Sequence, residues 1–253
     1  MTEEKVFQYL LITSFAFAVG VYITLLFVNA PYGRHLRKGW GVLIPNRAGW
    51  LLMEAPSALV MLVLFILGTA PKTAVLIIFF IAWQAHYVHR AFIYPFMITD
   101  GKKRIPLSVA AMGMFFNFGN GYLNGRYLFD YSCGYPDDWL TDGRFVLGAS
   151  LFVFGFATNR WADERLRKLR RNGNGSYYVP QGGLYKWISC PNYFGEILEW
   201  FGWALATWSW AGLSFAIWTL VNLVPRARAH HIWYHQTFEE YPTNRKALIP
   251  GVW

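Results

Sequence analysis

Charged residues are scarce in this chain: they make up 15% of its 253 residues, whereas hydrophobic residues make up 55%. Such proportions are typical of long apolar runs joined by short polar segments rather than of a soluble core. The 13 Trp, 15 Tyr and 21 Phe point the same way, because aromatic side chains gather at membrane interfaces. The composition therefore predicts an all-α integral membrane protein whose surface contacts a lipid bilayer.

The motifs of several common enzyme classes are also missing. No Gly-x-Gly-x-x-Gly follows a strand and no Gly-Lys-Ser/Thr loop occurs, so a nucleotide site would be of neither the Rossmann nor the P-loop type. Cys133 and Cys190 form no metal-ligand pattern, and we expect both to be free thiols. His86 with His89 and His231 with His235 have spacings that could ligate a metal. However, no His-Glu-x-x-His motif is present and nearby arginines would repel a cation, so we expect no metal.

Seven segments are apolar and long enough to cross a membrane, which takes about 20 residues as a helix. The fourth is the weakest, because Asn117, Gly119, Asn120 and Gly121 interrupt it. Such a break is tolerated only against protein or a water-filled cavity. With no repeat and no long linker, we expect one transmembrane catalytic domain over residues 1–253. The expected helices are residues 6–28, 48–68, 72–97, 107–123, 145–161, 192–209 and 213–234.

Basic residues alternate between the expected loops. The first, third and fifth loops and the C-terminal tail carry clusters of Lys and Arg, whereas the second and sixth carry one or none and the fourth is acidic. By the positive-inside rule, this pattern predicts an N-terminus outside and a C-terminus in the cytoplasm. The formal net charge of +9 lies mostly in these short loops, so we expect no nucleic-acid partner.

Polar residues lie inside the apolar segments of the last quarter of the chain. Asn192 and Glu196 are spaced i, i+4, and Arg226, His230 and Tyr234 are spaced i, i+4, i+8, so each set shares one face of a helix. Ionisable groups at membrane depth usually line a polar cavity rather than face lipid. The spacing therefore predicts an intramembrane pocket for a charged ligand.

Further polar residues on the expected cytoplasmic side suit a phosphate-bearing ligand. An arginine such as Arg170 can grip phosphate with its planar fork, and an acid such as Asp163 can accept from ribose hydroxyls. Asn159 and Tyr177 fall in the same region. For the other basic residues there, a role in topology or in contact with anionic lipid is at least as good an interpretation.

A second constellation lies deeper in the expected membrane. Glu54 is a lone carboxyl in the second span, where ionisation is costly unless the group is paired. Tyr87 lies in the third span and could meet Glu54 if the two helices are neighbours. A tyrosine hydroxyl held by a carboxyl could donate toward a ligand carbonyl. The alternative is a structural hydrogen bond that ties two helices together.

Long motifs run in order through nearly the whole chain after the first helix. They are residues 48–57, 86–90 with Tyr94, 119–121, 135–139, 180–184, 192–196 with Glu199 and Trp200, 204–209, and 241–250. Together they resemble the steroid 5α-reductases, the membrane 3-oxo-5α-steroid 4-dehydrogenases. The resemblance implies a seven-helix enzyme that uses NADPH to reduce the carbon 4–5 double bond of a 3-oxo-Δ4 steroid.

The resemblance also implies roles for individual residues. Glu54 and Tyr87 would polarise the carbon-3 carbonyl so that hydride can add at carbon 5, and Trp50, Met53 and Tyr94 would line the substrate pocket. Met53 stands where the resemblance leads us to expect a glutamine, which bears on substrate preference. The positions implied to bind the cofactor are Asn159, Asp163, Arg170, Tyr177, Asn192, Glu196, Arg226, His230 and Tyr234.

Other functions fit parts of the pattern. Another intramembrane sterol or enoyl reductase could share the C-terminal polar face. An isoprenylcysteine-type methyltransferase would use S-adenosylmethionine, whose lack of phosphate leaves the arginines without a role. A seven-helix receptor or carrier explains the topology but not the cytoplasmic polar cluster. We expect a monomer in a bacterial inner membrane or the endoplasmic reticulum.

Overall fold

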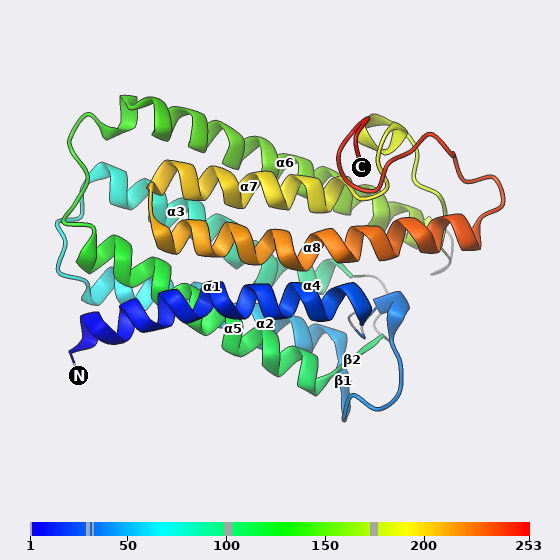
Figure 1. Cartoon of the computed structure of the whole chain (residues 1–253), viewed down its shortest axis with the longest axis horizontal. Helices are drawn as coiled ribbons and strands as arrows, with labels where there is room; N and C mark the ends of the chain where they lie inside the picture. Colours follow the sequence, from blue (N-terminus) through cyan, green and yellow to red (C-terminus); the bar gives the residue numbers. More distant parts are fainter. Residues whose placement is uncertain (1, 29–30, 32, 99–102, 173–176) are drawn as a thin grey trace. The chain divides into compact units, whose positions relative to one another are not determined.

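The computed structural model describes residues 2–28, 31, 33–98, 103–172 and 177–253, without the side chains of Arg34 and Asn172. Helices form nearly all of the regular structure in these ranges, which confirms the all-helical class (Figure 1). Two short strands, β1 (Leu43–Pro45) and β2 (Arg104–Pro106), pair antiparallel. The α-helices are α1 (Glu3–Phe27), α2 (Asn46–Leu67), α3 (Ala74–Val88), α4 (Tyr94–Met97), α5 (Leu107–Arg126), α6 (Gly143–Asn172), α7 (Pro191–Thr207) and α8 (Trp210–Thr237).

The chain divides into two compact units. Unit 1 contains Met1–Leu11, Ala30–Val146 and Ser209–Ala211, and unit 2 contains Ile12–Asn29, Leu147–Trp208 and Gly212–Trp253. Helix α1 thus contributes its first turns to unit 1 and the rest to unit 2. The residues expected to act on a carbonyl all fall in unit 1, and those expected to bind a cofactor all fall in unit 2.

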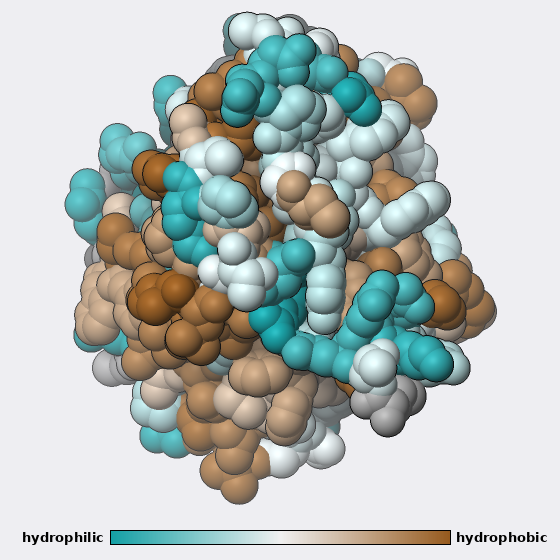
Figure 2. All heavy atoms as spheres, turned by 90° about the vertical axis from the view of Figure 1, so that its left-hand side faces the viewer, coloured by the Kyte–Doolittle hydropathy of each residue, from teal (hydrophilic) through white to brown (hydrophobic). Residues whose placement is uncertain are grey.

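Among the residues that the structure describes, three helical segments are long and apolar enough to cross a membrane: Glu3–Phe27, Asn46–Leu67 and Ala74–Met97. The last of these runs from α3 through a π-helical turn, η2 (His89–Ile93), into α4. Large apolar side chains also reach the surface, among them Phe27, which is 83% exposed. The face drawn in Figure 2 accordingly carries broad hydrophobic areas beside hydrophilic ones. These features fit a protein that lies in a lipid bilayer.

Helix α5 corrects the expectation of a broken fourth helix. It runs without interruption to Arg126 and continues into a π-helical turn, η3 (Tyr127–Tyr131). The glycines in it allow close packing: a Cβ at Gly121 would lie 3.3 Å from the Cβ of Val60 on α2. Helices α2 and α5 therefore lie along each other within unit 1 (Figure 1). The buried amides of this helix find protein partners, so no break is needed to satisfy them.

Helix α6 is longer than expected. The sequence analysis ended this helix at residue 161 and assigned the following basic residues to a loop, but the helix continues to Asn172. The residues after 162 include Glu, Leu, Lys and Arg, which are good helix formers, and no Gly or Pro appears before Gly173. Lys168 also pairs with Glu164 one turn earlier, at 2.6 Å.

Helices α6 and α7 approach each other at backbone distance within unit 2 (Figure 1). Each helix carries two glycines seven positions apart, Gly148 and Gly155 on α6 and Gly195 and Gly202 on α7. A Cβ at Gly155 would lie 2.4 Å from the main-chain nitrogen of Glu199, where only a hydrogen fits. The absence of side chains at these four positions therefore sets how closely the two helices pack.

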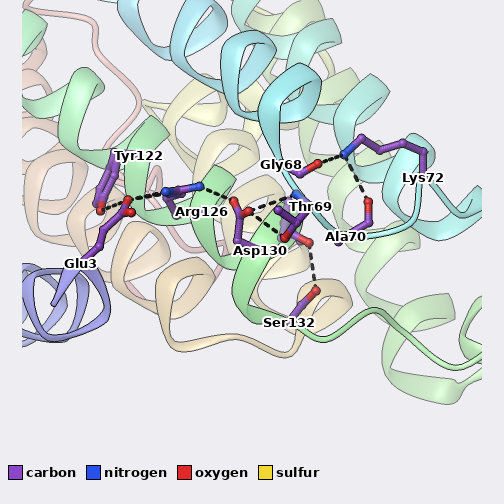
Figure 3. A network of polar contacts seen from close by, with 10 residues as sticks. Glu3, Gly68, Thr69, Ala70, Lys72, Tyr122, Arg126, Asp130 and Ser132 are labelled. Atoms are coloured by element: carbon purple, nitrogen blue, oxygen red, sulfur yellow. Dashed lines mark hydrogen bonds and ion pairs between the residues drawn. The ribbon is translucent and has the colours of Figure 1, made fainter.

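A polar network at one end of unit 1 joins three separate segments (Figure 3). The Nε of Arg126 donates to the carboxylate of Glu3 on α1 at 2.8 Å, and its Nη1 donates to Asp130 at 2.7 Å. Asp130 in turn accepts from the main-chain nitrogen of Thr69, at 3.1 Å, in the connection between α2 and α3. The network thus attaches the start of α1 to the end of α5 and to that connection.

Candidate functional site

The expected carbonyl-polarising pair comes together in unit 1 through a third residue. Glu54 lies on α2, Tyr87 on α3 and Asn117 on α5. The Tyr87 hydroxyl donates to Asn117 Oδ1 at 3.2 Å, and Asn117 Nδ2 donates to Glu54 Oε2 at 3.2 Å. A side-chain amide therefore links the phenol to the carboxyl.

Side-chain hydrogen bonds to the backbone place Tyr87 at this position. Trp83 Nε1 donates to the carbonyl of Ser57 at 3.1 Å, and Gln84 Nε2 donates to the carbonyl of Ala58 at 2.9 Å. Both acceptors belong to α2, so α3 is held against α2 just before Tyr87. The Trp83 ring also lies 5.0 Å from the Tyr87 ring, and both side chains are buried.

Arg90 supplies a positive charge beside the carboxyl. Its Nε lies 3.7 Å from Glu54 Oε1, and both side chains are largely buried, with 15% and 12% of their surfaces exposed. The guanidinium also lies 4.7 Å from the ring centre of Trp50 and 5.4 Å from that of Tyr94. Trp50 and Tyr94, both expected in the substrate pocket, therefore meet at Arg90, which the site prediction omitted although it lies three residues after Tyr87.

Met53, the third residue expected in the substrate pocket, makes one contact with its main-chain carbonyl and another with its side chain, both to α5. Its carbonyl accepts from Asn117 Nδ2 at 2.8 Å. Its side chain lies over Gly113 of α5, where an added Cβ would be 2.3 Å from Met53 Cγ. The side chain therefore packs on the backbone of α5, whereas its carbonyl helps to orient the Asn117 amide.

The buried amides of α5 were not predicted as site residues. Asn120 Nδ2 donates to the Tyr87 hydroxyl oxygen at 3.5 Å, and Asn124 Nδ2 donates to Asn120 Oδ1 at 3.0 Å. Asn117, Asn120 and Asn124 are spaced i, i+3, i+7, so they share one face of the helix. That spacing was the available signal, and it was interpreted as a break in the helix instead.

The expected cofactor residues of α6 and α7 form one hydrogen-bonded cluster in unit 2. Asn159 Nδ2 donates to the carbonyl of Asn192 at 3.0 Å and to Glu196 Oε2 at 3.2 Å. Asn192 Nδ2 donates back to Asp163 Oδ1 at 3.1 Å. Asn159 and Asp163 are buried. The close approach at Gly155, one turn before Asn159, is what brings these four side chains within reach.

Helix α8 carries the other expected cofactor residues of this part of unit 2, namely Arg226, His230 and Tyr234. The Tyr193 hydroxyl lies 3.0 Å from His230 Nε2, and the two rings stack, so α7 and α8 are joined at this level. Arg226 Nη2 donates to Asn222 one turn earlier, at 3.4 Å. Tyr234 is buried and stacks on Tyr241, with ring centres 5.1 Å apart.

The remaining expected cofactor residues, Arg170 and Tyr177, contact each other: the guanidinium lies 5.1 Å from the ring centre. Tyr185, which was not expected as a site residue, is buried close to several of the expected cofactor residues. Burial raises the pKa of its phenol, the nearby Tyr234 and Asp163 raise that pKa further, and Arg170 lowers it. Asp163, Arg170 and Tyr234 therefore all lie near one buried tyrosine.

The chemistry of this cluster suits a large polar ligand. Arg170 and Arg226 carry guanidinium groups that can bind phosphate. The amides and carboxylates of α6 and α7 can exchange hydrogen bonds with sugar hydroxyls or a carboxamide. The donor and acceptor set therefore fits a nicotinamide dinucleotide, and it needs no phosphate-binding glycine loop.

Comparison with known proteins gives the class to which these helices and sites belong. Residues 103–253 match the family model described as 3-oxo-5-alpha-steroid 4-dehydrogenase. The chain is 42% identical to steroid 5-alpha-reductase DET2 of Gossypium hirsutum, with 100% of the chain and 99% of the relative aligned. It is 40% identical to human 3-oxo-5-alpha-steroid 4-dehydrogenase 1, with 99% and 96% aligned. Together with the apolar helices, these matches place the chain among membrane oxidoreductases of steroid metabolism.

The chain belongs to the 3-oxo-5-alpha-steroid 4-dehydrogenase family. The family resemblance noted in the sequence motifs is thereby confirmed. Steroid 5-alpha-reductase DET2 of Arabidopsis thaliana, at 39% identity over 100% of the chain and 99% of the relative, gives the same result.

Proposed function

We propose that this protein reduces the carbon 4–5 double bond of 3-oxo-Δ4 steroids to 5α-dihydrosteroids, using NADPH. The observation that carries the proposal is the buried cluster of Glu54, Asn117 and Tyr87, in a chain that belongs to this family. A phenol whose hydroxyl is linked through an amide to a carboxyl is a group that can hydrogen-bond to a ketone oxygen.

The chemistry at the carbonyl follows from the charge that develops there. Reduction at carbon 5 of the conjugated enone pushes electrons toward the carbon-3 oxygen, which becomes enolate-like. A hydrogen bond from the Tyr87 hydroxyl to that oxygen strengthens as the charge grows, and this difference between ground and transition states lowers the barrier. Arg90 beside Glu54 adds positive charge to the region, and Trp50 and Tyr94 supply an apolar wall.

The cofactor would be held by residues of unit 2. Arg170 and Arg226 would bind phosphate groups, and His230, Tyr177 and Tyr234 would contact the rest of the dinucleotide. When bound, NADPH would supply the hydride for carbon 5, and a proton from solvent added at carbon 4 would convert the enolate to the saturated ketone. The remaining proposed contacts, to hydroxyl and carboxamide groups, come from Asn159, Asp163, Asn192 and Glu196.

We also propose that the chain crosses the membrane seven times as one catalytic domain, with the N-terminus outside and the C-terminus in the cytoplasm. The alternation of basic loops supports this orientation. The cofactor residues of α6 and α8 then lie toward the cytoplasm, where NADPH is found. We also propose that the protein is a monomer.

Product analysis tests the reaction. Detergent-purified protein is incubated with NADPH and testosterone or progesterone, alongside the variants Glu54→Gln and Tyr87→Phe. We expect a 5α-dihydro product whose rate of formation falls about a hundredfold or more in Tyr87→Phe, the effect of removing one such donor. NADPH binding should persist, because Tyr87 is not among the residues proposed to bind the cofactor. Tyr9→Phe, at an exposed position of α1, is the matched control.

Two results would contradict the proposal. Near-normal turnover in Tyr87→Phe would show that Tyr87 takes no part in the reaction. NADPH binding without reduction of either steroid would indicate that the substrate is another enone or sterol.

A separate variant tests the cofactor site. Arg226→Ala should raise the NADPH concentration needed for half-maximal rate, and an unchanged requirement would exclude a phosphate contact by Arg226.

A further inference from the structure

The hydrogen bonds of Asn117 determine which atom of the Tyr87–Glu54 pair donates. Asn117 Nδ2 lies 2.8 Å from the main-chain carbonyl of Met53, which has no proton to give. The amide nitrogen must therefore face Met53, and Asn117 Oδ1 must face Tyr87. Because Oδ1 can only accept, the Tyr87 hydroxyl is the donor in their 3.2 Å hydrogen bond.

The neighbouring amide completes this assignment. Asn120 Nδ2 donates to the Tyr87 oxygen at 3.5 Å, which leaves the single hydroxyl proton directed at Asn117. Tyr87 is 2% exposed, so bulk water does not compete for that proton. A tyrosine hydroxyl has only one proton to donate, so it can serve Asn117 or a ligand carbonyl, but not both at full strength.

We propose that Asn117 is a positioning residue that holds the Tyr87 proton in the resting enzyme, and that the substrate carbonyl must displace Asn117 Oδ1 as its acceptor. This inference rests on the proposed function, in which Tyr87 binds the carbon-3 oxygen. It also assigns Asn117 a second task, since its Nδ2 donates to Glu54 Oε2 and orients the carboxyl.

The displacement has consequences for which ligands bind. Carbonyl binding becomes an exchange of one hydrogen bond for another, so its net gain is small. A strong acceptor gains more from the exchange than a weak one. The oxygen of a conjugated enone is a stronger acceptor than that of an isolated ketone, so the 3-oxo-Δ4 substrate offsets the displacement of Asn117 better than its saturated product does.

The test measures how much a 3-oxo group adds to affinity. Binding of a 3-oxo-Δ4 steroid and of the same steroid without the 3-oxo group is compared in the wild-type protein and in Asn117→Leu. In the variant a carbonyl can accept from the Tyr87 hydroxyl without displacing Asn117 Oδ1. We expect the affinity ratio of the two steroids to rise by about 2-fold to 10-fold, the usual net contribution of one hydrogen bond. Turnover should fall at least about tenfold, because Glu54 and Tyr87 lose their shared partner.

Three further variants separate this role from a merely structural one. In a Tyr87→Phe background, Asn117→Leu should leave the affinity ratio unchanged, because the two changes act on the same bond. Thr219→Val is the control: it also removes a buried side-chain donor to a main-chain carbonyl, but at a position of α8 outside the residues assigned to either proposed site, and it should leave the ratio unchanged. Asn117→Ala removes the same groups without added bulk and replaces Asn117→Leu if that protein does not fold.

The outcomes distinguish the inference from the proposed function. If the wild-type protein neither reduces the enone nor prefers the 3-oxo steroid, the proposed function fails. If the wild-type protein shows the preference and Tyr87→Phe abolishes it, but Asn117→Leu and Asn117→Ala leave the ratio unchanged, the proposed function stands and the role of Asn117 is overturned. A ratio that rises equally in Thr219→Val would also overturn it.

Discussion

Replacing Gly155 by alanine tests whether the glycines of α6 and α7 position the proposed cofactor site. The new Cβ would lie 2.4 Å from the main-chain nitrogen of Glu199 and 2.4 Å from the carbonyl oxygen of Gly195. Ordinary contact begins near 3.4 Å. Backbone atoms cannot rotate away as a side chain can, so the two helices must separate by about 1 Å, and overpacking of this kind costs about 1–3 kcal/mol.

The same displacement reaches the polar cluster one turn away. Asn159 follows Gly155 by four residues, and its hydrogen bond to Glu196 is already 3.2 Å long. A further shift of about 1 Å breaks that bond, and misplacement on this scale can cost up to about a hundredfold in a site's function. We therefore expect Gly155→Ala to weaken NADPH binding at least about tenfold and to lower the unfolding temperature.

The assay is NADPH binding by fluorescence, with thermal unfolding in detergent followed in parallel. Gly20→Ala on α1 is the matched control, because a Cβ there meets nothing within 4 Å. Alanine favours a helix over glycine by up to about 1 kcal/mol, so the control should be neutral or slightly stabilised. Gly155→Ala with an unchanged unfolding temperature and unchanged affinity would refute the reasoning, since it would show that α6 and α7 can accommodate the added Cβ without disturbing the site.

Two further predictions concern charges outside the proposed sites. Arg126→Met removes the centre of the network that ties α1 to α5 in Figure 3. Because these groups are partly exposed, we expect the variant to lose about 1 kcal/mol or less of stability, measured as a lower unfolding temperature than wild type. The difference in unfolding temperature between variant and wild type should shrink at high salt, which screens the charges. An equal difference at low and high salt would contradict an electrostatic origin. Hydrogen bonds from Arg144 lower the pKa of Asp142 from 3.8 to about 2. The stabilisation is therefore fully present above pH 3.8 and is lost as the pH falls toward 2. Asp142→Asn should unfold at a lower temperature than wild type near neutral pH, and this gap should close on acidification; a gap that persists near pH 2 would refute the assignment.

Local pattern in the sequence was enough to predict which residues share a helix face. The i, i+4 spacing of Asn192 and Glu196 correctly indicated a common polar face, because a helix repeats every 3.6 residues whatever surrounds it. The pairing of Glu54 with Tyr87 was anticipated only on the condition that their helices are neighbours. The structure meets that condition through Trp83 and its bond to α2.

The least accurate expectations concerned residues whose role depends on a partner helix. Asn117 and Asn120 were interpreted as a break in the fourth helix, because polar residues in an apolar run are costly when unpaired. Their partners, Met53 and Tyr87, are more than 25 positions away in sequence, and no local pattern identifies them. The end of α6 was placed too early for a different reason: hydropathy marks where a helix leaves the membrane, not where it stops being helical.

The sequence by itself determined that this is an all-helical membrane protein of the 3-oxo-5-alpha-steroid 4-dehydrogenase family, and it indicated most of the proposed site residues. These properties follow from composition, helical periodicity and motifs that are local in the chain. Only the tertiary structure decided that Asn117 bridges Glu54 and Tyr87 and that Gly155 and Gly195 let two backbones touch. Hydrogen bonds and close contacts depend on distances of a few tenths of an ångström between helices, and those distances are set by packing.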